Sequence, residues 1–443
     1  MAFRTFGRAR RRGGVPLLAA PLLVLSIEPA RAAAQPVLDS GNTAWVLAAS
    51  ALVLLMTLPG LALFYGGLVR ARNSLSVLMH CFVITCIVSL IWMAFGYSLA
   101  FEAGNPVIGS FDAVFLGGGR AAVQANGLPK LAFAMFQSTF AIITPALIIG
   151  AFTERVRFSF VVLFSAAWLV LVYVPVAHWV WGGGWLAAAG TIDFAGGIVV
   201  HTTAGISALI AALLIGPRDG FPQRLDPPHS PGMTMAGAGM LWVGWFGFNG
   251  GSALAADGAA AAAIVATHTA AAAAGLAWIG VEWLRVGKPT CIGIVTGCVA
   301  GLAAITPASG YVSPAAAALI GMIAGIVCFF ATYTIKSRLR IDDSLDVFAV
   351  HGVGGMLGSL LVALLALPQL GGAGFGHPLG FAGQLGAQAL GIVAAGAWSA
   401  ALTVAIVKAI DATTGVRISR EEEREGIDLT THGERAYDLV ASG

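Results

Sequence analysis

Long apolar runs separated by short polar connections dominate the pattern of this chain. Between residues 42 and 410, hydropathy divides the sequence into eleven apolar segments, at 42–68, 75–100, 131–152, 157–180, 194–216, 233–251, 258–284, 290–306, 314–335, 346–367 and 381–410. About 20 predominantly apolar residues are enough to cross a bilayer as a helix. The pattern therefore predicts an all-α polytopic membrane protein with eleven transmembrane helices.

Residues 1–34 have the layout of a targeting sequence. A basic stretch that ends at Arg12 is followed by an apolar stretch that begins at Val15 and by small residues around Ala32. These are the three regions of a secretory signal peptide, and we expect cleavage near Gln35. An uncleaved first helix is the alternative, but the apolar stretch is shorter than the ~20 residues that a span requires.

Basic side chains gather in alternate connections between the apolar segments. The basic connections contain Arg70 and Arg72, Arg155 and Arg157, Arg218 and Arg224, Arg285 and Lys288, and Lys336, Arg338 and Arg340, whereas the intervening ones contain only Arg120 and Lys130. Basic connections lie on the cytoplasmic side of a membrane. We therefore expect a multi-pass protein of the cell inner (plasma) membrane, with the mature N-terminus outside and the C-terminus in the cytoplasm, which requires an odd number of spans.

Composition narrows the function further. The chain is 58% hydrophobic and 10% charged, whereas an ordinary soluble domain is about 25% charged. A net charge of +3 without a clustered basic face does not favour a nucleic-acid partner. The five cysteines lie in apolar segments without metal-ligand spacing, so we expect them to be small buried side chains. We expect no metal, no cofactor and no enzymatic activity, because no set of nucleophile, base and oxyanion donors is visible.

Two histidines stand in very apolar segments. His201 lies in 194–216 and His351 lies in 346–367, and glycines flank both rings. An ionisable residue inside a membrane segment indicates a substrate or proton pathway. Glycine-interrupted segments at matching places in two halves are typical of transporters with inverted repeats. We therefore predict an inverted five-plus-five repeat with a long final helix, in which the two rings approach from opposite faces and meet.

Several short stretches then agree in order and spacing with one family. They are Phe136 to Leu147, Ala177 to Gly184, Asp193 to Gly197 before His201, Gly244 to Asn249 with Ser252, and Asp342 to Asp343 with Asp346 to Phe348 before His351. In these stretches the chain resembles the ammonium transporter family (Amt/Mep/Rh), in its bacterial Amt type. The resemblance implies that residues 35–412 form an eleven-helix protomer with its own pore, that three copies form a homotrimer, and that the cargo is ammonium, with methylammonium as a related substrate.

The resemblance also implies an outer site and a gate. Trp181, Phe140 and Ser252 match the site that recruits the ammonium cation, and Phe140 and Phe248 match a stacked gate. Aromatic faces attract a cation, and a hydroxyl oxygen accepts from its four N–H groups. Phe136 is four residues before Phe140 and so shares its helix face. Pore lining and aromatic core packing both remain open for Phe136.

The resemblance places further residues along the pore. His201 and His351 match the paired histidines of the apolar conduit, and Trp245 packs near the gate, where core packing is its alternative. Asp193 matches an acidic residue needed beneath the outer site; capping of the next helix and proton transfer are both open for it. Neutral ammonia enters an apolar pore more readily than a cation does. We therefore expect deprotonation outside, passage as ammonia along the histidines and reprotonation inside, with coupled proton transfer or, alternatively, electroneutral conduction.

Residues 413–443 are the soluble part of the chain. The run from Glu421 to Asp428 and the stretch from Thr431 to Tyr437 resemble the cytoplasmic tail of the family. The resemblance implies a regulatory tail that touches a neighbouring subunit and communicates with PII-type signal proteins; a solvated charged face is the alternative. The rival to transport is an ammonium sensor or receptor with little net transport, which we do not favour because no output domain is visible.

Overall fold

The structure is a computed structural model, and it describes residues 37–119, 121–224 and 226–437. The expected signal peptide at 1–34 and its cleavage site lie outside the described residues. The described part of the chain is almost entirely helical, with two isolated β-bridges and no longer strand pairing. The expected all-α class is therefore confirmed.

The first five apolar segments are all helical. Their helices are α1 (Ser40–Leu55), η1 (Met56–Leu61) and α2 (Ala62–Leu68); η2 (Ala71–Asn73), α3 (Ser74–Ile91), η3 (Trp92–Gly96) and α4 (Tyr97–Phe101); α5 (Lys130–Ile148) and η5 (Ile149–Ala151); α6 (Phe158–Trp168), η6 (Leu169–Tyr173), α7 (Val174–Trp181) and α8 (Trp185–Ala188); and η7 (Gly197–Thr202) with α9 (Thr203–Ile215). Each of these five continuous runs is long and apolar enough to cross a membrane.

The second half is helical as well. Its helices are α10 (Pro231–Trp245) with η8 (Phe246–Gly250), α11 (Gly258–Val286), α12 (Cys291–Ile305), α13 (Pro314–Tyr333) with η9 (Thr334–Arg338), η10 (Phe348–Gly352) with α14 (Val353–Leu365), and α15 (Phe381–Asp411). Within the described residues, nine helical runs meet the length and hydropathy of a membrane span, and α10 and α12 are not among them. All eleven expected segments are thus helices, while the count of eleven spans stays a prediction.

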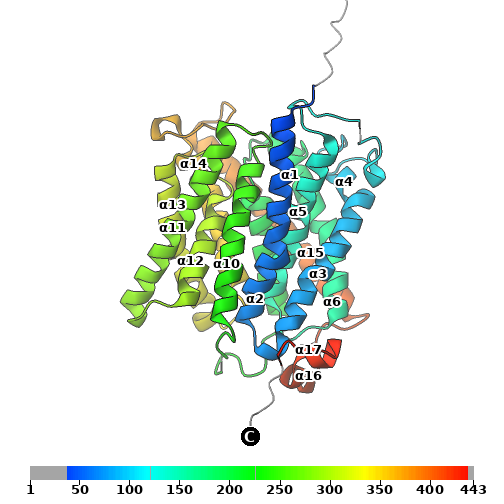
Figure 1. Ribbon diagram of the computed structural model, residues 1–443, viewed down its shortest axis with the longest axis vertical. Helices are drawn as coiled ribbons and strands as arrows, with labels where there is room; N and C mark the ends of the chain where they lie inside the picture. Colours follow the sequence, from blue (N-terminus) through cyan, green and yellow to red (C-terminus); the bar gives the residue numbers. More distant parts are fainter. Residues whose placement is uncertain (1–36, 120, 225, 438–443) are drawn as a thin grey trace, which may run out of the picture. The chain divides into compact units, whose positions relative to one another are not determined.

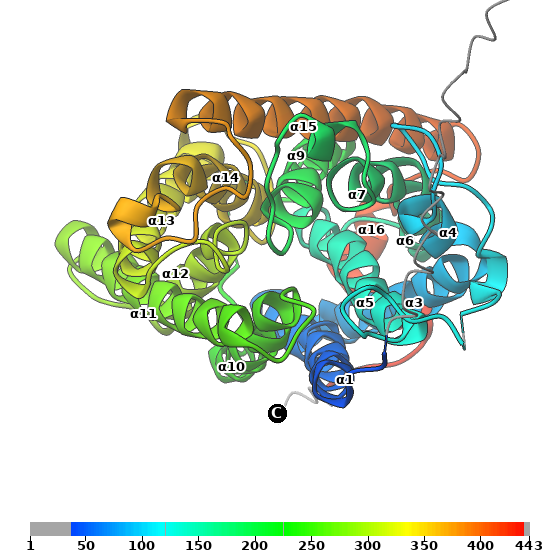
Figure 2. The ribbon, with the colours of Figure 1, turned by 90° about the horizontal axis from the view of Figure 1, so that it is seen from above.

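Six helices form a closed ring in the bundle. Contacts run from α1 to α5, on to α9, then through η10 and α14 to α12, and back through α10 to α1. Figure 2 shows this ring from above, with α15 lying along its side against α9 and α14. The short tail helices α16 (Arg420–Glu425) and α17 (Ile427–His432) lie at one end of the bundle (Figure 1). The axis of the ring is the natural place for a pathway.

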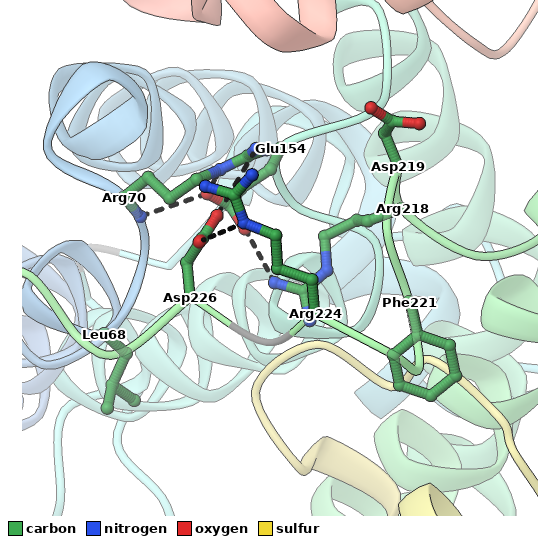
Figure 3. A pocket seen from close by; sticks show the side chains of 8 residues that line it. All are labelled: Leu68, Arg70, Glu154, Arg218, Asp219, Phe221, Arg224 and Asp226. Atoms are coloured by element: carbon green, nitrogen blue, oxygen red, sulfur yellow. Dashed lines mark hydrogen bonds and ion pairs between the residues drawn. The ribbon is translucent and has the colours of Figure 1, made fainter.

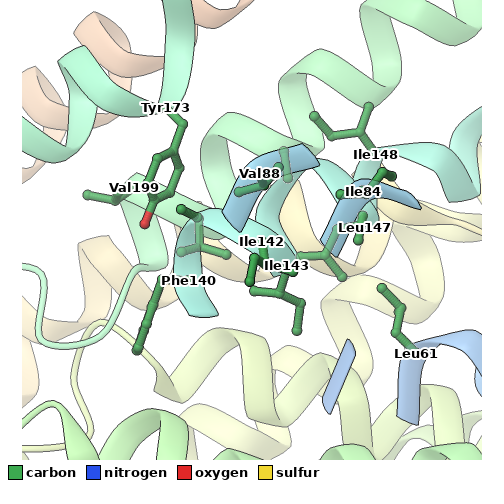
Figure 4. Close-up of a cluster of buried hydrophobic side chains, with 14 of the residues drawn as sticks. Leu61, Ile84, Val88, Phe140, Ile142, Ile143, Leu147, Ile148, Tyr173 and Val199 are labelled. Carbon is green, nitrogen blue, oxygen red and sulfur yellow. The ribbon is translucent and has the colours of Figure 1, made fainter. Parts of the chain in front are cut away.

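Apolar side chains fill the space between neighbouring helices. Ile84 and Val88 of α3 lie beside Ile142 and Ile148 of α5, and all four side chains are almost fully buried (Figure 4). Nearly every residue of α5 is buried, because helices surround it on all sides. A helix that is apolar all round belongs inside a bundle in this way.

Small residues set the distance between α11 and α13. A Cβ atom added at Gly321 or Gly325 would overlap the backbone of Ala270 or Ala274 on α11. Close backbone approach of this kind stabilises helix pairs in membranes, where the hydrophobic effect between helices is weak. The alanine-rich stretch at 258–284 is therefore a packing surface.

Four of the five basic connections meet at one end of the bundle. Glu154 accepts hydrogen bonds from Arg70 at 2.8 Å and from Arg218 at 2.6 Å (Figure 3). Arg218 also pairs with Asp342 at 2.8 Å. Burial tends to raise the pKa of the Glu154 carboxyl, but the Arg218 and Arg70 guanidinium groups outweigh it and lower the pKa to about 2. These ion pairs join alternate connections of the chain. Alternate connections were expected to lie on the same side, and these contacts agree with that expectation.

The expectation that all five cysteines are buried is wrong for two of them. Cys81 and Cys328 are buried and Cys298 is partly buried, but Cys86 and Cys291 are exposed. An apolar side chain on the outer surface of a membrane helix needs no protein around it, since lipid is as apolar as the core. Hydropathy therefore indicates a membrane segment without showing which of its faces points inward.

Candidate functional site

A cavity lined mainly by aromatic side chains lies near the ends of α7 and η8. We name it the aromatic cavity; its volume is about 260 Å³, and Phe101, Phe133, Gln137, Phe140, Val180, Trp181, Phe194, Ser252 and Leu254 line it. The three residues expected at the recruiting site, Trp181, Phe140 and Ser252, therefore line one cavity. The ring of Phe140 stands edge-on to the ring of Trp181, with centroids 5.9 Å apart.

Polar groups hold the lining of the aromatic cavity in place. The indole N–H of Trp181 donates to the carbonyl of Asp193 at 2.8 Å, and the hydroxyl of Ser252 donates to the carbonyl of Phe248 at 2.8 Å. Because the only hydrogen of the Ser252 hydroxyl is used in this way, its oxygen is left to act as an acceptor. The geometry suits a small cation that carries hydrogen-bond donors.

Two stacked rings separate the aromatic cavity from the centre of the bundle. The rings of Phe140 and Phe248 lie 4.2 Å apart between centroids at an angle of 30°, and both are almost fully buried. The first lines the aromatic cavity, and the second lines the cavity below it. The pair therefore forms a closed constriction in this structure.

Beneath the constriction the two histidines meet. Nδ1 of His201 and Nδ1 of His351 lie 3.3 Å apart, and the ring planes are inclined by 19°. This contact confirms the prediction that the two rings meet. Glycines allow the approach: a Cβ atom at Gly205 would overlap the backbone of Gly352, and one at Gly355 would come within 2.7 Å of Cβ of His201.

The histidine pair lies in a narrow apolar cavity, which we name the conduit cavity. Its volume is about 10 Å³, and Met56, Leu61, Phe64, Ile143, Leu147, Val200, His201, Leu241, Trp245, Phe248, Val299 and His351 line it. A cavity of ~10–15 Å³ holds about one water-sized molecule. Nε2 of His201 is buried and has no hydrogen-bond partner among the described residues, so a polar guest would find a free ring nitrogen.

Asp193 holds the helix that carries His201. Its Oδ1 accepts from the backbone N–H groups of Gly196 at 2.9 Å and Gly197 at 2.7 Å, and its Oδ2 accepts from those of Ile198 at 2.8 Å and Val199 at 3.0 Å. These four donors have no partners within the first turn of a helix. The capping alternative is therefore confirmed, and a role in proton transfer stays a prediction.

Trp245 and Phe136 occupy different surroundings. The Trp245 ring stacks on His201 with centroids 5.5 Å apart, lines the conduit cavity and donates its indole N–H to Thr306 at 2.9 Å. Phe136 instead packs edge-on behind Phe140 with centroids 4.9 Å apart and is absent from the lining of both cavities. Of its two alternatives, the structure places Phe136 in aromatic packing. A shared helix face does not decide which ring is nearer the axis.

Gln137 lines the aromatic cavity, although the sequence motifs did not predict it as a site residue. Its Oε1 is buried without a hydrogen-bond partner among the described residues. A buried amide oxygen normally has a partner. The sequence did carry a signal, because an uncharged polar residue in the apolar segment 131–152 is costly unless it faces a polar guest.

Together these observations define a class: a multi-pass helical membrane protein whose axis carries an aromatic cavity, a closed ring pair and a histidine-lined conduit. The model of the Ammonium Transporter Family matches residues 44–437. The ammonium transporter of Aquifex aeolicus is 47% identical over 425 residues, covering 94% of this chain and 98% of the relative. Amt1 of Archaeoglobus fulgidus is 45% identical over 406 residues, covering 90% and 100%. The chain belongs to the ammonium transporter family.

Solved structures show the same fold. A structure described as a Sensor Amt Protein has a TM-score of 0.82 at 33% identity and covers 88% of this chain and 98% of its own. The crystal structure of Candida albicans Mep2 has a TM-score of 0.80 at 35% identity and covers 87% and 88%. The chain is thus similar both to a protein described as a sensor and to a Mep-type relative.

Proposed function

We propose that this protein transports ammonium across a membrane and that the axis of the helix ring is its pathway. The observation that carries the proposal is the order of the parts: an aromatic cavity with free acceptor atoms, a constriction, and then an apolar conduit with a histidine pair. Relatives that match nearly the whole chain are named ammonium transporters. Methylammonium is the second substrate that we propose.

The aromatic cavity recruits the cation in this proposal. Trp181 and Phe140 offer ring faces for cation-π attraction, while the oxygen of Ser252 and Oε1 of Gln137 accept from its N–H groups. A weakly hydrated cation loses part of its water shell on entry, and these groups replace it. A water molecule carries no net charge, so the ring faces attract it less strongly than they attract the cation.

The conduit cavity favours the neutral form. A bare cation in an apolar channel loses most of its solvation, whereas ammonia loses little. Ammonium therefore gives up one proton before the constriction, and the remaining ammonia passes Phe140 and Phe248. On the far side ammonia takes up a proton again, so that the cargo leaves as ammonium.

The histidine pair suits both hydrogen bonding and proton relay. Because the two Nδ1 atoms face each other at 3.3 Å, one of them must carry the hydrogen and the other must accept it. If Nδ1 of His201 donates, its unpartnered Nε2 is an acceptor open to an ammonia N–H or to a proton; in the reverse arrangement Nε2 is a donor. Exchange between the two arrangements moves a proton across the pair, which is the coupled route that we propose.

Reconstituted protein tests the proposal. Coupled transport produces an ammonium-evoked current in proteoliposomes, and His201→Ala and His351→Ala reduce it strongly. His268→Ala is the matched control, since this histidine lies on α11 against Trp242 and Phe246 and does not line the conduit cavity. Alkalinisation of the vesicle lumen without a current would contradict the coupled route and indicate electroneutral ammonia conduction. Absence of both the current and the alkalinisation would contradict transport and favour the sensor alternative. The observation behind that alternative is the similarity to a protein described as a sensor.

We also propose a regulatory tail at the cytoplasmic end. The Asp428 carboxylate accepts from the backbone N–H groups of Leu75 at 3.0 Å and Ser76 at 2.7 Å, and Arg424 pairs with Asp219 at 2.9 Å. Family resemblance supports contact with a neighbouring subunit of a homotrimer and with PII-type signal proteins. Deletion of residues 413–443 that leaves transport, trimer mass and binding of a PII-type protein unchanged would contradict this role.

The proposed domain organisation has three parts: a cleaved signal peptide at 1–34, the transport domain at 35–412 and the tail at 413–443. The protein lies in the inner (plasma) membrane with its mature N-terminus outside, as the basic connections indicate. N-terminal sequencing of the purified protein tests cleavage, with Gln35 as the expected first residue. Labelling of cysteines introduced at Asp112 and Arg338 tests orientation, with the first position accessible from outside and the second from the cytoplasm.

A further inference from the structure

A second aspartate stands in the same relation to His351 as Asp193 does to His201. In both cases the acid precedes the histidine by eight residues, at 193 and 201 and at 343 and 351. Asp343 is fully buried, and its Oδ2 accepts from the backbone N–H of Phe348 at 2.7 Å, at the start of η10. Each acid therefore caps the π-helical segment that presents one ring of the pair.

The two caps differ in how fully their oxygens are used. Both oxygens of Asp193 accept two N–H groups each, as described above, so a proton there would have to displace a hydrogen bond. Oδ1 of Asp343 is buried and has no hydrogen-bond partner among the described residues. An ionised carboxylate oxygen without donors is costly in a buried place, and a proton relieves that cost.

Charged and titratable neighbours of Asp343 come from several elements. Asp346 lies in the same connection; its Oδ2 pairs with Lys336 of η9 at 2.8 Å, and its Oδ1 is buried without a partner among the described residues. Tyr65 of α2 also lies near Asp343, but its hydroxyl donates to the carbonyl of Leu147 at 3.1 Å. The adjacent Asp342 is engaged by Arg218 and Arg155, whose guanidinium groups are tied up in the ion network at that end.

These surroundings place the titration of Asp343 at mildly acidic pH. Burial, together with the negative charge of Asp346, raises the pKa of the Asp343 carboxyl to about 6, while the N–H groups of Phe348 and Val347 and the ammonium of Lys336 oppose the rise. A carboxyl group with this pKa is mostly ionised at neutral pH and takes up a proton as the pH falls below 6.

We propose that Asp343 is a positioning residue for His351 that works in its ionised form, so that a proton bound to the Asp343 carboxylate slows transport. The inference rests on the proposed function. When ionised, Asp343 accepts a charge-assisted hydrogen bond from the backbone N–H of Phe348 and places a negative charge at the start of η10, the segment that carries His351. A negative charge there favours the protonated form of a nearby imidazole. Protonation weakens both effects and leaves the fold intact.

Transport across a series of symmetrical pH values tests the consequence. If only ionised Asp343 supports transport, a pKa of about 6 makes the wild-type rate at pH 5 about tenfold lower than at pH 8. Asp343→Asn keeps an acceptor for Phe348 but cannot ionise, so its rate is low and flat over the same range. Proteoliposomes with equal pH on both sides make the orientation of the protein irrelevant.

Two neighbouring variants shift the midpoint in opposite directions. Asp346→Asn removes a negative charge, so it lowers the pKa of Asp343 and moves the midpoint to lower pH; Lys336→Gln removes a positive charge and moves it to higher pH. A purely structural cap would change the rate without moving the midpoint. The exposed Asp112→Asn is the matched control and leaves the profile unchanged.

A spectroscopic readout separates this inference from the proposed function. Infrared difference spectra of the purified full-length protein are expected to show a carboxylic acid band that titrates near pH 6 in the wild type and is missing in Asp343→Asn. Absence of transport with the band present would contradict the proposed function alone. A wild-type spectrum identical to that of Asp343→Asn, or a midpoint that neither Asp346→Asn nor Lys336→Gln moves, would overturn the inference.

Discussion

The cap formed by Asp193 gives a prediction whose size follows from the structure. In Asp193→Asn the amide oxygen can replace only one of the two carboxylate oxygens, and its NH₂ group then faces two backbone N–H groups. Either orientation loses two of the four hydrogen bonds. A hydrogen bond to a charged group contributes about 1.5–3 kcal/mol, so the loss is about 3–6 kcal/mol.

This loss is expected to be local, because the bonds hold the first turn of η7. Amide hydrogen exchange with mass spectrometry is the suitable assay, since exchange at residues 197–203 reports the free energy of opening that turn. A loss of about 3 kcal/mol accelerates exchange there by about a hundredfold or more. Transport is expected to fall with it, because the same turn presents His201 to its partner ring.

A second aspartate provides the matched control. Asp257 caps α11 with Oδ1 alone, which accepts from Ala259 at 2.9 Å and Ala260 at 3.1 Å. Asp257→Asn keeps both bonds and is expected to leave exchange and transport near the wild type. If Asp193→Asn changes exchange no more than this control does, the reasoning about the cap is refuted. If exchange accelerates while transport stays normal, a proton-transfer role for Asp193 is excluded.

Three further outcomes test other parts of the structure. Gln137→Leu removes the unpartnered amide oxygen from the aromatic cavity and is expected to raise the half-saturating ammonium concentration severalfold in current recordings, unlike Gln124→Leu outside that cavity. Phe248→Ala opens the constriction and is expected to admit water or larger amines in a vesicle swelling assay; unchanged selectivity would argue against a gate. Glu154 has its pKa lowered to about 2 from 4.5, so it stabilises the fold above its unfolded-state pKa, and this contribution disappears as pH falls towards 2. Glu154→Gln is therefore expected to cost about 3 kcal/mol at neutral pH in thermal unfolding and to remove this acid-dependent loss.

The sequence predicted the helices and the two histidines of the site because both signals are local. An apolar run of the right length specifies a membrane helix without reference to its neighbours, and the eleven expected segments are all helical. A histidine in such a run is costly wherever the run is placed. The resemblance to the ammonium transporter family then pointed to Trp181, Phe140 and Ser252, which the structure brings to one cavity.

Relations between segments needed the tertiary structure. Phe136 and Phe140 share a helix face, but only the packing of η8 and α7 against α5 shows that Phe140 lines the cavity and Phe136 lies behind it. Hydropathy likewise could not show that Cys86 faces outward. Membrane helices are apolar on every side, so the amphipathic pattern that orients a helix in a soluble protein is weak.

The sequence by itself determined that this is a polytopic helical protein with two costly histidines, because hydropathy and the expense of a buried ring are properties of single segments. The tertiary structure alone decided how close the rings come and how their helices are held. Close glycine contacts set the separation of the rings: Gly205 of α9 faces Gly352 of η10, and Gly355 of α14 faces His201 of η7. Two buried aspartates cap the segments that carry the histidines, with unequal numbers of hydrogen bonds. Those features depend on which backbones approach each other, and no local pattern of residues encodes that choice.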